Sequence, residues 1–183
     1  MVRNKNIALL AVSVVAIAAM VSFGLTGIMS SHVADAQQVT AGDGTLVKVA
    51  SVSDASQMVG WQARSPDPAL APAKAQFEVD VMKLRMASQG QNSRPVGQTW
   101  TLPDGSWIRL VQVPGLKAPN TGDTITIGSI QGEKLYYAAS GNIPARVSLY
   151  WQQGNIGFCL SGTLTNSVTE ETLLAMANSL VAQ

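Results

Sequence analysis

One long uncharged segment near the N-terminus constrains this chain more than any other feature. It runs from Ile7 to Met29, 23 residues without an Asp, Glu, Lys or Arg. A helix of that length measures about 34 Å at about 1.5 Å per residue. A bilayer's hydrocarbon layer is about 30 Å thick. The sequence therefore predicts a transmembrane or signal helix over residues 7–29.

Basic residues around this segment predict its orientation. Arg3 and Lys5 precede it, and no Lys or Arg follows until Lys48. The positive-inside rule then makes residues 1–6 a cytoplasmic tail and places the rest outside. The length favours an uncleaved, single-pass anchor in the cell membrane, because apolar cores of signal peptides usually span about 7–15 residues. The alternative is a secreted protein, cleaved near Ala36.

The remaining chain divides into a linker over residues 30–44 and one domain over residues 45–183. The linker is rich in Ser, Ala, Gln and Gly. After residue 36 the chain carries ten basic and ten acidic residues, scattered rather than clustered. This balance leaves no basic patch of the kind that binds nucleic acid. Cys159 is the single cysteine, so no internal disulfide forms, and its apolar neighbours indicate a small buried side chain.

Alternating apolar and polar residues, with turn signals between them, predict a series of strands. They cover residues 45–50, 77–83, 98–102, 106–113, 124–130, 134–139, 146–151 and 156–163. Hairpin turns are expected at 103–105 and 152–155, and a further turn at 131–133. One helix should begin at Ser51 and end at Gly60, and a second should follow Ser167 or Thr169. The pattern predicts an α+β domain with a mainly antiparallel sheet and two packed helices.

Four stretches of the chain resemble a known family. They are residues 148–154, with Tyr150-Trp151 before a Gly turn, residues 158–162, residues 169–180, and the opening segment 51–61. Together they resemble a bacterial extracytoplasmic domain of unknown function, found on membrane-anchored, anti-sigma-factor-like proteins. The resemblance implies a binding or sensing module without catalysis. Because the expected cytoplasmic tail is too short to hold a sigma factor, any regulatory output would pass through another protein.

The candidate functional residues are few. His32 is the only histidine and lies beside the apolar segment, so the domain lacks a His-based nucleophile system and the Cys/His clusters of zinc sites. Glu78 and Asp80 share one face of a predicted strand, where paired carboxylates can act on glycosides, although a solvated strand face explains them as well. Trp100 and Trp107 flank a hairpin and form a possible exposed contact surface.

Three functions remain open from these observations. The first is a membrane-anchored, extracytoplasmic, non-catalytic binding module for an envelope protein, peptide or other envelope component, with no catalytic, cofactor or metal site. The second is a cleaved, secreted carrier of an apolar ligand. The third is a hydrolase that uses carboxylates such as Glu78 and Asp80.

Overall fold

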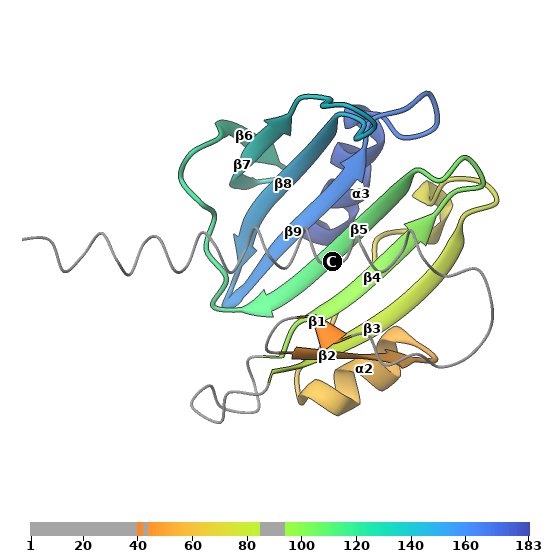
Figure 1. Ribbon diagram of the computed structural model, residues 1–183. Coiled ribbons are helices and arrows are strands. Elements are labelled where there is room, and N and C mark those ends of the chain that lie inside the picture. The colour runs from red at the N-terminus through yellow and green to blue at the C-terminus, as the bar shows by residue number, and fades with distance from the viewer. Residues whose placement is uncertain (1–39, 42–43, 85–93) are drawn as a thin grey trace, which may run out of the picture.

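In the part of the chain that the structure describes, nine antiparallel strands form one continuous sheet, and two helices pack on it (Figure 1). This computed structural model describes residues 40–41, 44–84 and 94–183. The strands lie in the order β1-β2-β3-β4-β5-β9-β8-β7-β6. The predicted α+β class, with a mainly antiparallel sheet and two helices, is thus confirmed. The expected tail over residues 1–6 and helix over residues 7–29 lie outside the described residues.

The described elements follow one another along the chain. Their bounds are β1 Thr40–Ala41, β2 Gly44–Val49, α2 Val52–Val59, the 3₁₀ turn η1 Pro68–Leu70, β3 Gln76–Leu84, β4 Val96–Thr101, β5 Trp107–Pro114, β6 Asp123–Ile127, β7 Ile130–Tyr137, β8 Arg146–Gln153, β9 Ile156–Thr163 and α3 Glu170–Val181. The short strand β1 pairs with β2, so the sheet begins inside the stretch that the sequence assigns to a linker.

Both helices begin at the side-chain caps that the sequence indicates. The Ser51 hydroxyl accepts a hydrogen bond from the backbone N–H of Asp54 and donates one to its carboxylate. Gly60 ends α2 in the left-handed conformation, with φ of 75°. Of the two candidate caps for α3, Thr169 is the one used, and it accepts from the backbone N–H of Thr172.

The two predicted hairpins are present, but the third turn lies elsewhere than expected. The chain turns at Gly128 and Ser129 rather than at residues 131–133, which belong to β7. Gly128 has a φ of +57°, a conformation that glycine adopts without steric cost. Its backbone N–H also donates to the Asn178 side chain of α3. The apolar pair Ile127 and Ile130 then packs toward the core on either side of this turn.

Two hydrophobic clusters lie on the same face of the sheet, which we call the helix face. Under α3, the larger cluster brings Leu173, Met176 and Leu180 against side chains of the central strands, such as Ile108 and Leu160. Under α2, a smaller cluster joins Ala55 and Val59 to residues of β3 and β4. Fully burying one such large apolar side chain contributes about 1.5–3 kcal/mol, so these clusters stabilise the fold.

The segment between α2 and β3 crosses the helix face and is held by two buried amides. Gln98 and Gln112 are fully buried, and each donates from Nε2 to the carbonyl oxygen of Arg64. Gln112 also accepts from the Arg64 backbone N–H, and Gln98 accepts from the Ser65 hydroxyl. Buried polar groups need such partners. The two glutamines therefore fix the path of a segment that forms no strand.

Candidate binding site on the polar face of the sheet

The face opposite the helices carries a row of polar side chains, and we call it the polar face. Side chains alternate between the two faces along a strand, so residues paired across the sheet share a face. Thr99 pairs with Arg109, Arg109 with Ser161, and Ser161 with Ser148. In the described part of the chain, α2 and α3 both lie behind this row (Figure 1). The polar face is therefore the candidate surface for a binding site.

A bidentate ion pair lies at one side of this face. The guanidinium of Arg109 donates from Nη1 and Nη2 to the two carboxylate oxygens of Asp80, each at 2.9 Å. Nη1 also donates to the hydroxyl of Thr99 at 2.6 Å. Gly97 lies beneath the pair, and a Cβ there would come within 2.6 Å of Asp80 Oδ1. The cluster is consequently a closed structural unit in which both charges have partners.

The centre of the polar face is neutral. The hydroxyls of Ser148 and Ser161 lie 2.7 Å apart, and the thiol of Cys159 lies 3.4 Å from the Ser161 hydroxyl. Cys159 is buried, as the sequence predicts, and its burial raises the pKa of the thiol. Burial also raises the pKa of the neighbouring Tyr150 phenol, with Cys159 and Tyr137 adding to the effect. A thiol kept protonated is a poor nucleophile.

At the other side of the face, Glu133 fixes the connection between β5 and β6. Its side chain is buried, and its carboxylate accepts the backbone N–H groups of Asn120, Thr121 and Gly122. The bond from Asn120 measures 2.8 Å. Consecutive N–H groups that converge in this way form a concave anion-binding nest. Here the anion belongs to the protein, so the nest holds residues 120–122 against β7.

The loop that Glu133 holds forms one wall of a groove of about 540 Å³. The Glu133 and Tyr150 side chains contribute to its lining from the polar face. Around them are exposed polar side chains from the loop and from three strands, namely Lys117, Asn120, Thr124, Gln131 and Gln152. The amides and the hydroxyl can both donate and accept hydrogen bonds, and the ammonium group of Lys117 can donate them. The groove is therefore suited to a polar ligand.

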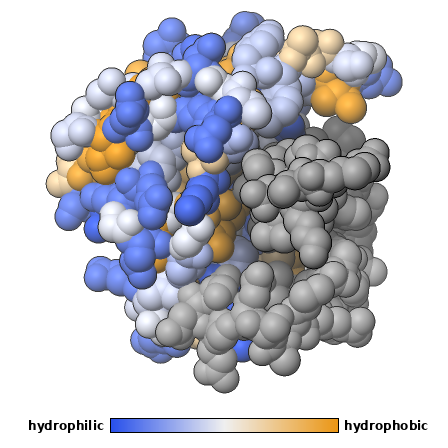
Figure 2. Space-filling model, turned by 90° about the vertical axis from the view of Figure 1, so that its left-hand side faces the viewer, coloured by the Kyte–Doolittle hydropathy of each residue, from blue (hydrophilic) through white to orange (hydrophobic). Residues whose placement is uncertain are grey.

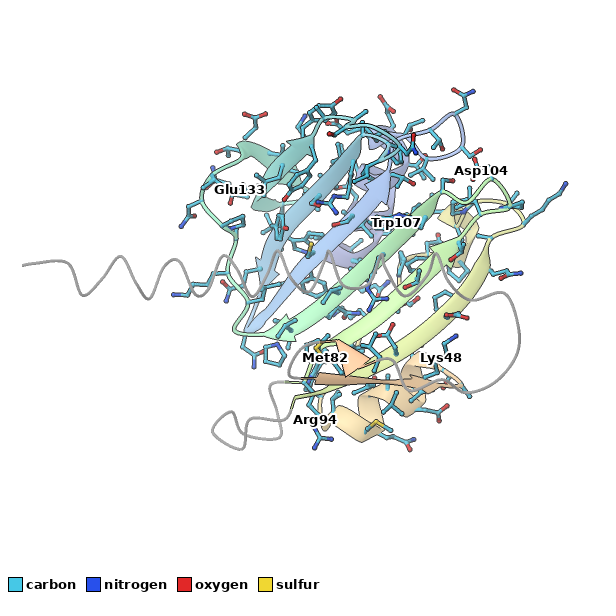
Figure 3. All side chains as sticks on the ribbon, in the orientation of Figure 1. Lys48, Met82, Arg94, Asp104, Trp107 and Glu133 are labelled. Carbon is cyan, nitrogen blue, oxygen red and sulfur yellow. The ribbon has the colours of Figure 1, made fainter. Side chains whose placement is uncertain are left out.

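The groove lies near the edge of the sheet formed by β6 and β7. Figure 3 shows Glu133 near this edge, well separated from Trp107 and Asp104. Figure 2 turns this side of the molecule toward the viewer, and hydrophilic residues predominate there, with hydrophobic ones in small separate areas. This surface matches the polar lining of the groove.

Trp100 and Trp107 do not form the predicted exposed contact surface. Trp100 is 5% exposed and Trp107 is 6% exposed. The register pairs Trp100 with Ile108 and Trp107 with Thr101, so the two indoles lie on opposite faces of the sheet. Trp100 belongs to the core and lies 5.0 Å from the ring of Phe77, centroid to centroid.

Glu78 and Asp80 share a face, as predicted, but each has a basic partner. The Glu78 carboxylate accepts from Lys48 at 2.8 Å, and Asp80 is held by Arg109. The hydrolase hypothesis needs one free acid and one free base, and this pair offers neither. In the described ranges, no group of three His, Cys, Asp or Glu side chains is placed to hold a metal ion.

The sequence reasoning missed Glu133 and the groove. The sequence places Glu133 in the expected turn over residues 131–133 and predicts no element between the strands at 106–113 and 124–130. A weak signal was present, since the stretch Asn120-Thr121-Gly122 is small and polar, and an acidic residue lies nearby in the sequence. No local pattern, however, indicates that these backbone groups converge on that carboxylate.

No family model matches the sequence, and neither a curated protein nor a solved structure is significantly similar to it. The resemblance to extracytoplasmic domains of anti-sigma-factor-like proteins thus stays a prediction. Among the residues that the structure describes, no helix is both long and apolar enough to cross a membrane.

Proposed function

We propose that the chain is a membrane-anchored, extracytoplasmic binding module that holds an envelope peptide or protein segment in the groove and catalyses no reaction. One observation carries the proposal: five exposed polar side chains surround a groove whose wall is fixed by three hydrogen bonds to Glu133. A wall fixed before binding lowers the entropic cost of association.

The non-catalytic part of the proposal follows from the chemistry of the groove. Of its charged groups, the Glu133 carboxylate is occupied by backbone N–H groups. Lys117 lies exposed on the surface, and the phenol of Tyr150 is kept protonated by burial. General acid–base catalysis needs a group poised to exchange a proton near neutral pH. The described lining of the groove supplies hydrogen bonds instead.

The membrane part of the proposal depends on the uncharged segment Ile7–Met29 and its basic flank. Alkaline carbonate extraction of membranes, with N-terminal sequencing of the exported protein, tests it. An anchored chain stays in the membrane pellet and keeps its first residues. A soluble chain that begins at Gln37 would contradict the anchor and favour the secreted alternative. That carrier would, however, hold an apolar ligand, and the groove is mainly polar.

Binding is tested by selecting a displayed random-peptide library on the full chain in lipid nanodiscs. We expect the enriched peptides to lose affinity, by about tenfold for each lost hydrogen bond of about 1.4 kcal/mol, for Gln131→Ala and Gln152→Ala. Gln57→Ala, on the exposed surface of α2, is the matched control. Peptides that bind the groove variants and the parent equally would refute the groove as the site.

A further inference from the structure

The end of β7, together with the connection that follows it, carries most of the exposed large apolar side chains in the described part of the chain. Those side chains belong to five residues: Met58, Phe77, Tyr136, Tyr137 and Ile143. The last three lie within residues 136–146, which we call the β7–β8 tip. Tyr136 is 61% exposed, and Ile143 is 64% exposed. Tyr136 and Tyr137 lie on opposite faces of the sheet, because they pair with Val147 and Arg146. Exposed apolar residues on both faces of one end of the sheet indicate that this end contacts a partner.

The fold itself holds these side chains outward. The pairing of β6 with β7 ends at Asp123 and Lys134, so Tyr136 and Tyr137 extend past the end of β6. Beyond them, Ser140 and Ile143 exchange two backbone hydrogen bonds of 3.0 Å each. This bridge closes a tight loop with the Ile143 side chain on its outer surface.

The charge of the tip restricts the kind of partner. Residues 136–146 contain no Asp or Glu, and their one charged side chain is Arg146. Its guanidinium carbon lies 4.2 Å from the centre of the Tyr137 ring, a cation–π arrangement. Tyrosine rings favour the level of the lipid headgroups, and arginine next to apolar residues is attracted to anionic lipid surfaces. The β4–β5 turn, by contrast, carries Asp104.

We propose that the β7–β8 tip inserts into the headgroup layer of an anionic bilayer, with Ile143 and Tyr136 reaching the acyl boundary. The inference rests on the membrane location proposed above and adds an orientation to it. The groove residues Gln131 and Gln152 lie at the opposite ends of β7 and β8 from the tip. A tip in the bilayer would therefore turn the groove away from the membrane.

The two ends of β8 provide matched positions for a test. Asn142 lies in the tip and Asn155 in the β8–β9 turn, and both are exposed. Each is replaced by cysteine in a Cys159→Ser background and labelled with bimane. The full chain is then reconstituted in vesicles of phosphatidylcholine and phosphatidylglycerol that contain doxyl-labelled lipid. We expect strong quenching at position 142 and little at position 155.

Further variants separate insertion from mere proximity. Ile143→Ser and Tyr136→Ser replace exposed side chains, so the fold should tolerate them, which circular dichroism checks. Each should reduce quenching at position 142 several-fold, and vesicles without anionic lipid should reduce it as well. Equal quenching at both positions, or no change in these variants, would overturn the orientation.

The anchor and the tip fail in different ways. If the chain resists carbonate extraction but position 142 is not quenched, the tip proposal is wrong and the anchor stands. If the chain is extracted, the anchor is wrong. The same label then tests the tip on the extracted chain with added vesicles, where unquenched fluorescence refutes it.

Discussion

Replacing Arg109 by methionine should destabilise the protein more than any comparable change of a surface charge. Arg109 contacts both carboxylate oxygens of Asp80 and the hydroxyl of Thr99. The side chains of the pair are only 13% and 12% exposed. Methionine keeps much of the packing volume, but it leaves the Asp80 carboxylate with little water and no cation.

The expected cost lies between two limits. Removing one partner of a fully buried ion pair costs about 3–5 kcal/mol, whereas an exposed pair contributes about 0–1 kcal/mol. With slight exposure on both sides, we expect Arg109→Met to lower the free energy of unfolding by about 2–4 kcal/mol. At about 2–4 °C for each kcal/mol, Tm should fall by about 4–16 °C.

Urea unfolding of the full chain in detergent, followed by tryptophan fluorescence, measures this cost. Lys48→Met is the matched control, because Lys48 and Glu78 form an ion pair of 2.8 Å whose side chains are 71% and 55% exposed. The double variant Arg109→Met with Asp80→Leu should recover much of the lost stability, since no unpaired charge remains. If Arg109→Met costs no more than Lys48→Met, the reasoning is refuted.

Three further predictions concern Glu133, the buried thiol and phenol, and Gly157. Glu133→Gln should accelerate amide hydrogen exchange at residues 120–122 by about tenfold, because a neutral amide oxygen accepts N–H groups about 1.4 kcal/mol less strongly than a carboxylate does. Unchanged exchange would show that the carboxylate does not hold these N–H groups. Burial raises the pKa of Cys159 and of Tyr150 in the folded chain. The stabilisation that comes from keeping these groups protonated is therefore fully present below the pKa of an unfolded cysteine, and it is lost as pH rises above about 9. In urea unfolding, the double variant Cys159→Ser, Tyr150→Phe should lose this pH dependence of the free energy of unfolding. Gly157→Ala would place a Cβ 2.6 Å from the Cβ of Leu116 in the β5–β6 connection. Thermal unfolding should therefore show a loss of about 1–3 kcal/mol in the free energy of unfolding. An unchanged Tm would show that the connection does not pack against Gly157.

Much of the fold could be predicted because its signals are local. The hairpin between β4 and β5 is indicated by Pro103-Asp104-Gly105, and Gly105 has the expected positive φ of 81°. Thr169, one of the two expected caps, begins α3, and the stripe of Leu173, Met176 and Leu180 at helical spacing is buried. Caps, turns and stripes depend on residues close together in the sequence.

The features that the sequence could not predict depend on strand register and on the path of a long connection. Trp100 and Trp107 could not be placed without the exact pairing, because a shift of one residue moves a side chain to the other face. Their partners prove to be Ile108 and Thr101. Similarly, the charge pattern around Asp80 does not reveal that Arg109, two strands away, holds it.

The junction between β5 and β9 has a consequence for how the chain is made. Every other ladder of the described sheet joins strands that are neighbours in the sequence. The β5–β9 ladder can form only after nearly the whole domain has been synthesised. Until β9 pairs with it, β5 ends a five-stranded meander, β1 to β5, with a row of unpaired N–H and C=O groups. Such an edge recruits strands of other nascent chains. Aggregation during biosynthesis should therefore begin at β5, and mutations that slow the docking of β9 should lower yield before they alter the stability of the finished protein.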